Sequence, residues 1–334
     1  MVGLDAVLRY KYDINISNNI FVNSSLLLLQ LLITLQVISM TNLHPVAMLI
    51  ASVWIILEIV VIWINLFKNR GLLNLKNSSM SELHQLEEKI LGRKWFYEFK
   101  LPGGKVTESY LPEYALPIHA TRTQMMNEFL DTFGGQLKDL RCVDLACHEG
   151  YFSHQLIQKG VKEVTGIDAR ADHVEHANWI RQMYGHKNLQ FKVGDIQKLT
   201  PQEIGKFDFT LLFGILYHLE NVVGALRFAH AITEKVCLIE TQIVPNMTGV
   251  IDWGSHRFNK EIIGCMAIID ETQELQSDNP EANTTPITIV PSLPGLLWLL
   301  KAVGFKRTTV LNPPPDAYEQ LASYKRVIVA AYNF

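Results

Sequence analysis

Gly150 and Asp168 have the spacing of a nucleotide-binding β-α-β unit. Gly150 closes a turn after an apolar run that begins at Cys142, a helix-like segment follows from Tyr151 to Lys159, and a second β-rich run ends on Asp168. In such a unit the turn and the helix N-terminus lie near the polar groups of a ligand, and the acid accepts hydrogen bonds from ribose hydroxyls. These residues therefore predict a site for a nucleotide-like ligand.

The turn before Gly150 argues against a dinucleotide. It runs from Asp144 to Gly150 and keeps only the last glycine of the Gly-x-Gly-x-x-Gly fingerprint. The chain offers instead Asp144 at the start of the turn, Asp195 in a Gly-Asp-Ile after the third apolar run, and a segment from Gly214 to Leu219 after the fourth.

The elements that must position these residues alternate between strands and helices. Expected strands are Cys142 to Ala146, Val161 to Ile167, Leu189 to Val193, Phe207 to Phe213, Lys235 to Glu240, Lys306 to Leu311 and Arg326 to Tyr332. Expected helices are Thr121 to Phe133, Tyr151 to Lys159, His173 to Tyr184, Val222 to Ile232 and Pro294 to Val303. Such alternation favours a mainly parallel sheet covered on both faces, and the last strand is compatible with an antiparallel partner.

From Arg141 to Glu240 the chain resembles a class I S-adenosylmethionine-dependent methyltransferase, with four motifs in the family's order. The resemblance implies a doubly wound, mainly parallel seven-stranded Rossmann-like sheet and S-adenosylmethionine as the cofactor. It places the loop from Ala146 to Gly150 near the methionine part, Asp168 at the ribose hydroxyls, and Asp195 at the adenine amino group. Ala146 and His148 stand where the family usually has glycines. The cofactor-binding residues that it implies are Asp144, Ala146, His148, Gly150, Asp168, Ala169, Asp195, Ile196, Phe213 and Gly214.

Tyr217 and His218 are the catalytic candidates, because the resemblance places their segment along the methyl-transfer pocket. His218 could act as a general base, or it could orient the loop through a backbone hydrogen bond, and both interpretations stay open. Tyr217 is interpreted as a pocket wall rather than a proton donor. The expected reaction is direct in-line displacement, in which the protein supplies proximity and orientation. No metal site is expected, since His173 and His176 share a helix face that we interpret as solvated.

A narrower resemblance is to the wobble-uridine tRNA carboxymethyltransferases. The segments that carry it are Trp95-Phe96, residues 216–218, Ile239 to Thr241, Ile289 to Ser292 and Gly304-Phe305. Whether the cofactor is carboxylated or ordinary stays open. The aromatic segment from Trp95 to Pro117 contains Pro102-Gly103-Gly104, which predicts a hairpin turn. This segment is either a lid over the pocket or the packing face of an appended hairpin.

Composition favours a small-molecule, lipid or glycan acceptor. The formal net charge is −3, and few basic residues flank the expected pocket mouth, whereas an RNA substrate calls for a basic rim. The alternatives are an RNA methyltransferase of the tRNA wobble-uridine type, and a catalytically silent membrane-tethered binding protein, which the altered glycine loop would suit. The four cysteines are spaced singly, which indicates free thiols in a reducing compartment. The oligomeric state is not indicated.

The N-terminal region predicts a transmembrane helical hairpin within residues 20–67. Residues 14–57 contain no Asp, Glu, Lys or Arg, and the apolar block 46–67 is long enough to cross a bilayer core of about 30 Å. Lys68, Arg70 and Lys76 follow it, which by the positive-inside rule places the catalytic domain in the cytoplasm. If the true start is Met80, the protein is instead expected to be soluble and cytoplasmic. The expected domains are the hairpin and linker (1–79), a helix with the aromatic segment (80–120), and the methyltransferase domain (121–334) with an insertion at 245–291.

Overall fold

The computed structural model describes residues 80–252, 254, 260–276 and 285–334, and five single residues, Val53, Leu57, Val60, Val61 and Ile64. The chain divides into two compact units, Met1–Glu82 and Leu83–Phe334. The predicted hairpin at 20–67 lies outside the described residues apart from those five. Within the described part of the chain, no helix is both long and apolar enough to cross a membrane.

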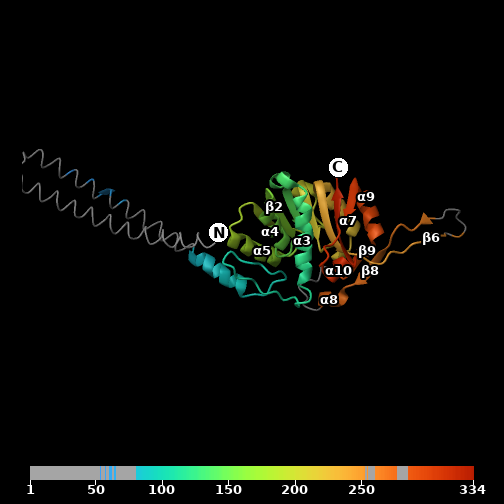
Figure 1. The fold of residues 1–334 in the computed structure, drawn as a ribbon, viewed down its shortest axis with the longest axis horizontal. Coiled ribbons are helices and arrows are strands. Elements are labelled where there is room, and N and C mark those ends of the chain that lie inside the picture. The colour runs from blue at the N-terminus through green and yellow to red at the C-terminus, as the bar shows by residue number, and fades with distance from the viewer. Residues whose placement is uncertain are drawn as a thin grey trace, which may run out of the picture. The chain divides into compact units, whose positions relative to one another are not determined.

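The second unit is built on one sheet of seven strands in the order β10-β11-β5-β4-β1-β2-β3 (Figure 1). The strands are β1 (Arg141–Leu145), β2 (Glu163–Asp168), β3 (Leu189–Val193), β4 (Phe207–Phe213), β5 (Thr233–Gln242), β10 (Arg307–Val310) and β11 (Arg326–Tyr332). All neighbours pair in parallel except β11, which is antiparallel to both β5 and β10. The predicted fold class is therefore confirmed for this domain, and the carboxyl ends of β1 to β5 share one edge.

Helices cover both faces of the sheet because successive strand residues point to opposite sides. Cys142 of β1 packs into one core cluster with Met126 and Leu156, and Val143 packs into the other with Leu226 and Leu300. The first cluster includes α3 (Pro117–Asp131), α4 (Tyr151–Lys159) and α5 (Ala171–Tyr184); the second includes α7 (Val222–Ile232) and α9 (Leu293–Val303). Shorter helices are η1 (Gly134–Asp139), α6 (Pro201–Ile204), η2 (Leu216–His218) and α10 (Glu319–Ala322). Each side of the sheet is thus buried, and the site is left to the strand ends.

The aromatic segment ahead of the domain packs onto it. Residues 80–91 are helical, and the chain then forms isolated bridges between Trp95 and Ser109 and between Lys100 and Val106. The predicted turn at Pro102 to Gly104 is present, but no extended hairpin ladder flanks it. Buried Trp95 and Phe99 fix the segment in the first core cluster.

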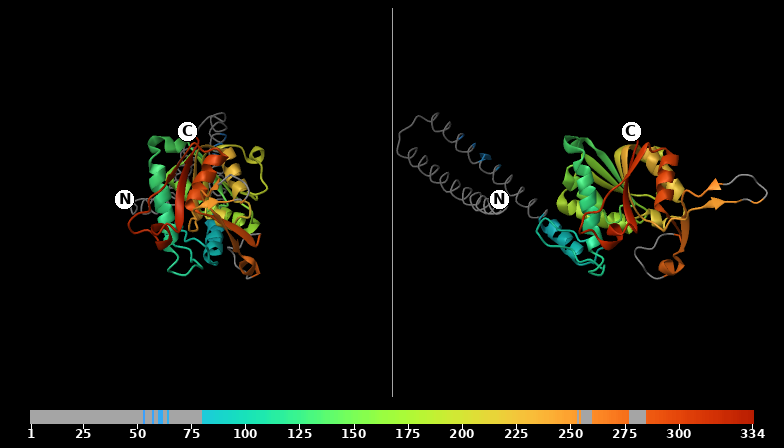
Figure 2. Two further views of the ribbon diagram at one scale, coloured as in Figure 1. Left: turned by 90° about the vertical axis from the view of Figure 1, so that its right-hand side faces the viewer. Right: turned by 45° about the vertical axis from the view of Figure 1, so that its right-hand side comes forward.

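The predicted insertion contains two small antiparallel ribbons where the sequence showed no periodicity. One pairs β6 (Val250–Ile251) with β7 (Lys260–Glu261), and the other pairs β8 (Met266–Asp270) with β9 (Ile287–Pro291), with α8 (Thr272–Gln276) after β8. Figure 2 shows the β6 and β7 ribbon extending away from the sheet, whereas β9 joins the loop after β4 through the amide of Ile289, which donates to the carbonyl of Leu219 at 3.2 Å.

Candidate active site

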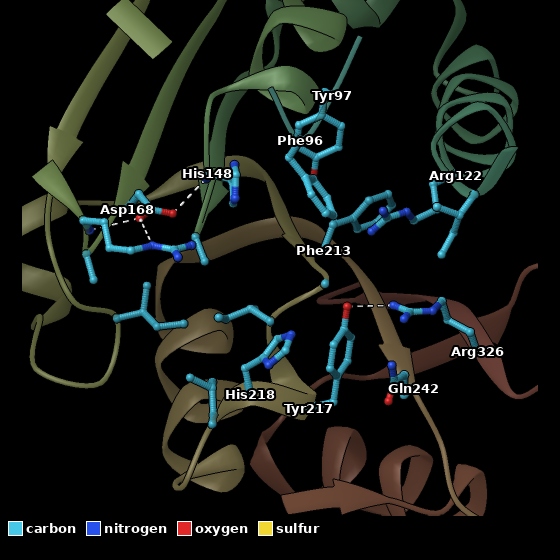
Figure 3. A pocket seen from close by; sticks show the side chains of 18 of the residues that line it. Phe96, Tyr97, Arg122, His148, Asp168, Phe213, Tyr217, His218, Gln242 and Arg326 are labelled. Atoms are coloured by element: carbon cyan, nitrogen blue, oxygen red, sulfur yellow. Dashed lines mark hydrogen bonds and ion pairs between the residues drawn. The ribbon is translucent and has the colours of Figure 1, made fainter. Parts of the chain in front are cut away.

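A cavity of about 360 Å³ opens at the carboxyl ends of the parallel strands (Figure 3). Ten of the predicted site residues line it: Ala146, His148, Asp168, Ala169, Asp195, Ile196, Phe213, Gly214, Tyr217 and His218. The remaining two, Asp144 and Gly150, lie behind the cavity wall. Residues from four strand ends therefore meet in one place, as the order of the motifs predicted.

The loop after β1 keeps a left-handed backbone where the family's glycines would stand. Ala146 has φ 57° and His148 has φ 54°, and Gly150 follows with φ 79°. A left-handed conformation is unfavourable for residues with a Cβ, and it persists only when the surroundings fix it. One fixing contact is the amide of His148, which donates to Oδ2 of Asp168 at 2.8 Å. Ala146 and His148 thus adopt a conformation that glycine adopts readily, and they add side chains at the cavity.

Asp168 is a buried carboxylate that joins β2 to this loop. Besides the His148 amide, it accepts a hydrogen bond from the amide of Arg170 at 3.0 Å, and the Arg170 guanidinium nitrogen Nε lies 3.7 Å away. A carboxylate has about four acceptor positions, so two backbone donors leave room for ligand hydroxyls. Figure 3 shows its side chain at the cavity wall beside His148.

Asp144 and Gly150 shape the loop from behind. Oδ2 of Asp144 accepts from the hydroxyl of Ser153 at 2.6 Å, and burial, opposed by this hydrogen bond, raises the pKa of Asp144 to about 7. A Cβ on Gly150 would come within 2.5 Å of the Phe191 ring, so both its positive φ and the lack of space require glycine. Neither residue lines the cavity, so a role for them in holding the cofactor would be indirect.

The interpretation of His173 as part of a solvated helix face is wrong. Its side chain is buried, and its ring centroid lies 3.9 Å from that of His148. Burial, with His148 and Arg170 nearby, lowers the pKa of His173 far below its usual value, so the ring is neutral. The pattern of residues i and i+3 could not reveal this because the partner ring comes from the loop after β1. Within the described ranges, no group of His, Cys, Asp and Glu side chains could hold a metal ion.

A charged network that the sequence did not predict forms the opposite wall. Arg326 at the start of β11 donates from Nη1 to the hydroxyl of Tyr217 and to Oε1 of Glu240, both at 2.8 Å. Arg122 of α3 places its Nη1 3.5 Å from Oε2 of the same glutamate, which is fully buried. Two guanidinium groups therefore face one carboxylate beside the cavity. In the sequence, Arg326 stands out as a charged residue at the start of an apolar run, but its partners are far away in the sequence and cannot be identified from it.

The aromatic segment covers the cofactor loop and also packs against the domain. Phe96 and Tyr97 line the cavity, and the Tyr97 ring stacks on Tyr151 at 4.6 Å between centroids. Glu149 holds the segment in place, because its Oε2 accepts from the amide of Phe96 at 2.9 Å and its Oε1 pairs with Arg93 at 2.8 Å. Side chains of this segment thus line the cavity and also pack against the domain, and its role as a lid stays a prediction.

Comparison with known proteins agrees with this geometry. Residues 136–288 match the family model described as "Methyltransferase domain". Among curated proteins, the tRNA U34 carboxymethyltransferase of Cellvibrio japonicus is 24% identical over 190 residues, which is 56% of this chain and 52% of that protein. The bifunctional O-antigen chain terminator methyltransferase/kinase WbdD of Escherichia coli is 26% identical over 105 residues, which is 31% of this chain and 15% of that protein. The chain thus spans about half the length, or less, of the curated relatives it matches.

A solved structure has the same fold. The N-terminal domain of EvdMO1, crystallised in the presence of S-adenosylhomocysteine and D-fucose, superposes with a TM-score of 0.52 at 18% identity, covering 77% of this chain and 96% of that one. The sheet order, the strand-end site and the family match together define a methyltransferase domain of the class I, S-adenosylmethionine-dependent kind. The recognition made from the motifs is therefore confirmed for this domain.

Proposed function

We propose that this protein transfers the methyl group of S-adenosylmethionine to a small-molecule, lipid or glycan acceptor by direct in-line displacement. The observation that carries the proposal is a cavity that combines Asp168 and Asp195, at the ends of adjacent strands, with Tyr217 and His218 after β4. Carboxylates at one side and a polar loop at the other suit a ribose-bearing donor and a separate acceptor. The class I domain supports the same reaction.

The residues present fit the cofactor. Asp168 retains acceptor positions for the ribose hydroxyls, and Ala169 and Ile196 offer apolar surface beside Asp195 for the adenine ring. Oδ1 of Asp195 accepts from the amide of Gln197 at 3.0 Å, which orients this carboxylate. When bound, the cofactor supplies an electrophilic methyl carbon on a sulfonium. The chain's own part is to orient the two reactants beneath Phe96 and to exclude water.

Tyr217 serves as a pocket wall in this proposal. Its hydroxyl accepts a hydrogen bond from Arg326 at 2.8 Å, so its position is fixed. The excess of arginine over glutamate next to it favours a ligand that carries an anionic group. That group would lie on the acceptor or on the cofactor.

The same charge excess favours one alternative, a carboxymethyl transfer from a carboxylated cofactor to a tRNA wobble uridine. Relatives with the name tRNA U34 carboxymethyltransferase support this candidate. Calorimetric titration with S-adenosylmethionine and with its carboxylated analogue separates the two. Tighter binding of the ordinary cofactor favours methyl transfer, and a preference of tenfold or more for the carboxylated form would favour the alternative.

The test of the proposed function is cofactor binding by calorimetry to the full chain and to Asp168→Ala. Loss of hydrogen bonds to a charged group costs about 1.5–3 kcal/mol, so we expect affinity to fall roughly 10- to 100-fold. Asp172→Ala, an exposed acid four residues further on in α5, is the matched control and should bind normally. No binding to the unaltered protein at millimolar cofactor would support the catalytically silent alternative instead.

We also propose that the N-terminal hairpin at 20–67 anchors the protein in a membrane, with the catalytic domain in the cytoplasm. The uncharged composition and the basic residues that follow support this location. A membrane anchor would favour acceptors found at a bilayer surface.

A further inference from the structure

The β8 and β9 ribbon brings a glutamate from the predicted insertion to the catalytic candidate His218. Glu271 follows β8 directly, and its amide donates to the carbonyl of Pro286 at 2.9 Å, next to the last residue pair of the ribbon. Its Oε1 lies 3.5 Å from Nδ1 of His218, and the two side chains are 16% and 25% exposed. Figure 3 shows the His218 imidazole at the cavity beside Tyr217.

The carboxylate of Glu271 is little used by the fold. Its Oε2 is buried and has no hydrogen-bond partner among the residues that the structure describes. A buried carboxylate without compensation is unfavourable, and a nearby cation removes that cost. An imidazolium at His218 would be this cation, and it would exist only after the ring had taken up a proton.

We propose that His218 and Glu271 form a dyad that removes the proton from a hydroxyl acceptor, so that the reaction is an O-methylation. This proposal rests on the proposed function and narrows its acceptor to the hydroxyl of a sugar, a lipid or a small alcohol. His218 is the catalytic residue, since it touches the acceptor. Glu271 is a positioning residue that acts on Nδ1.

The step balances without a further reactant. A lone pair of the hydroxyl oxygen forms the new bond to the methyl carbon, the carbon–sulfur bond breaks, and its electron pair stays on sulfur as a neutral thioether. The hydroxyl proton moves to Nε2 of His218. The resulting imidazolium charge is balanced by the Glu271 carboxylate until the proton leaves to water.

A base beside the methyl-transfer pocket argues for a hydroxyl over a carboxylate or phosphate acceptor, because those two acceptors need no base. Carboxylates and phosphates are already ionised near neutral pH, whereas an alcohol keeps its proton until the bond to carbon forms. Two other carboxylates of the described residues have partners of their own. Glu240 pairs with Arg326, whose Nη1 also donates to Tyr217, and Glu220 accepts from Thr285 at 3.0 Å.

The decisive test is the pKa of His218 in the full chain, measured by NMR on protein with ¹⁵N-labelled histidine. The His218 signal is assigned by its loss in His218→Asn. Glu271→Gln should lower this pKa by about one unit, because an opposite charge at this distance favours the imidazolium. Glu271→Asp should restore part of the shift, and Glu274→Gln, an exposed glutamate in the short helix α8 that follows Glu271, should not change it. An equal pKa in Glu271→Gln and the unaltered protein would overturn the dyad.

The acceptor class is tested with methyl-labelled S-adenosylmethionine and three sets of probes: monosaccharides and glycerol, primary amines, and carboxylic acids. We expect label in an alkali-stable ether of a hydroxyl compound, with kcat reduced about 100-fold or more in Glu271→Gln and the cofactor KM unchanged. Label in amines or alkali-labile esters, or none in any hydroxyl compound, would overturn the assignment of the acceptor class.

Cofactor calorimetry separates failure of this inference from failure of the proposed function. The unaltered protein and Glu271→Gln should bind S-adenosylmethionine equally. Absent binding to the unaltered protein would reject the proposed function. Normal binding combined with an unshifted His218 pKa would reject the dyad alone.

Discussion

Asp144 at the end of β1 connects the loop to the first helix through a proton-dependent contact. Its carboxyl group is buried, accepts a hydrogen bond from Ser153, and lies close enough to Asp168 for that charge to raise its pKa further. The pKa of about 7 means that the folded protein holds a proton that the unfolded chain releases near pH 4. The residue therefore links the stability of the cofactor loop to pH.

Replacing Asp144 with Asn should remove part of the pH dependence of stability. Because the folded pKa is raised, the contribution of Asp144 is fully present below the unfolded value and is lost as pH rises through about 7. Between pH 4 and 7 the unaltered protein should therefore lose up to about 1.4 kcal/mol of stability per pH unit relative to Asp144→Asn. Urea unfolding at several pH values measures the difference in unfolding free energy between the two proteins. The histidines are the same in both, so their contributions to the pH dependence cancel in this difference. A difference that does not change with pH would contradict the shifted pKa.

Sequence alone located the site residues that follow strands, and it missed those that depend on long-range pairing. Asp168, Asp195 and His218 were found because each follows a short apolar run, and a strand end is a local signal. Arg326 and Glu271 were not identified as site residues, and Glu240 was identified only as the end of a predicted strand. Arg326 meets Glu240 only because β11 inserts antiparallel beside β5, and Glu271 meets His218 only because β9 joins the loop after β4.

At the scale of elements, strands with two buried faces were predicted well and exposed ribbons were not. β4 and β11 have the predicted bounds, because both of their faces are buried and they read as continuous apolar runs bounded by turns. β3 also has the predicted bounds, although it is an edge strand with mostly exposed side chains. β6 and β7 have two residues each, and their side chains are exposed, so burial imposed no pattern on the sequence. The lid segment was suggested by its aromatic residues, but its anchor Glu149 was not.

Glu149→Gln should loosen the lid without unfolding the domain. The glutamine can still accept a hydrogen bond from the Phe96 amide. The ion pair between Arg93 and the buried carboxylate is lost, which should reduce stability by about 1–3 kcal/mol. Hydrogen exchange should quicken in peptides within residues 93–111 and stay unchanged in β4, and cofactor affinity should fall because Phe96 and Tyr97 line the cavity.

The matched control for the lid is Glu108→Gln. Glu108 pairs with Lys94 in the same segment, but both side chains are more than half exposed, so its loss should change little. Unchanged exchange of the lid in Glu149→Gln would mean that aromatic packing, chiefly Tyr97 on Tyr151, holds the segment without the ion pair.

At the scale of the whole molecule, composition divides the chain near residue 80. The uncharged stretch 14–57 and the basic residues after 67 are unlike the methyltransferase domain, whose two core clusters include no residue before Ile90 among those described. The N-terminal region is thus distinguished from the domain by its composition. Its apolar length is consistent with burial in lipid.

If residues 20–67 span a bilayer, the full chain should sediment with membranes and resist an alkaline carbonate wash, because tens of apolar residues would have to enter water on release. A chain shortened to begin at Met80 should remain in the supernatant and bind S-adenosylmethionine with the same affinity, since every cavity residue follows that position. Replacing Lys68, Arg70 and Lys76 with Gln should reduce the preference for a cytoplasmic domain, which protease protection in sealed vesicles measures. Equal partition of the full and shortened chains would reject the membrane hairpin, and release of the full chain by carbonate would indicate surface attachment in place of a span.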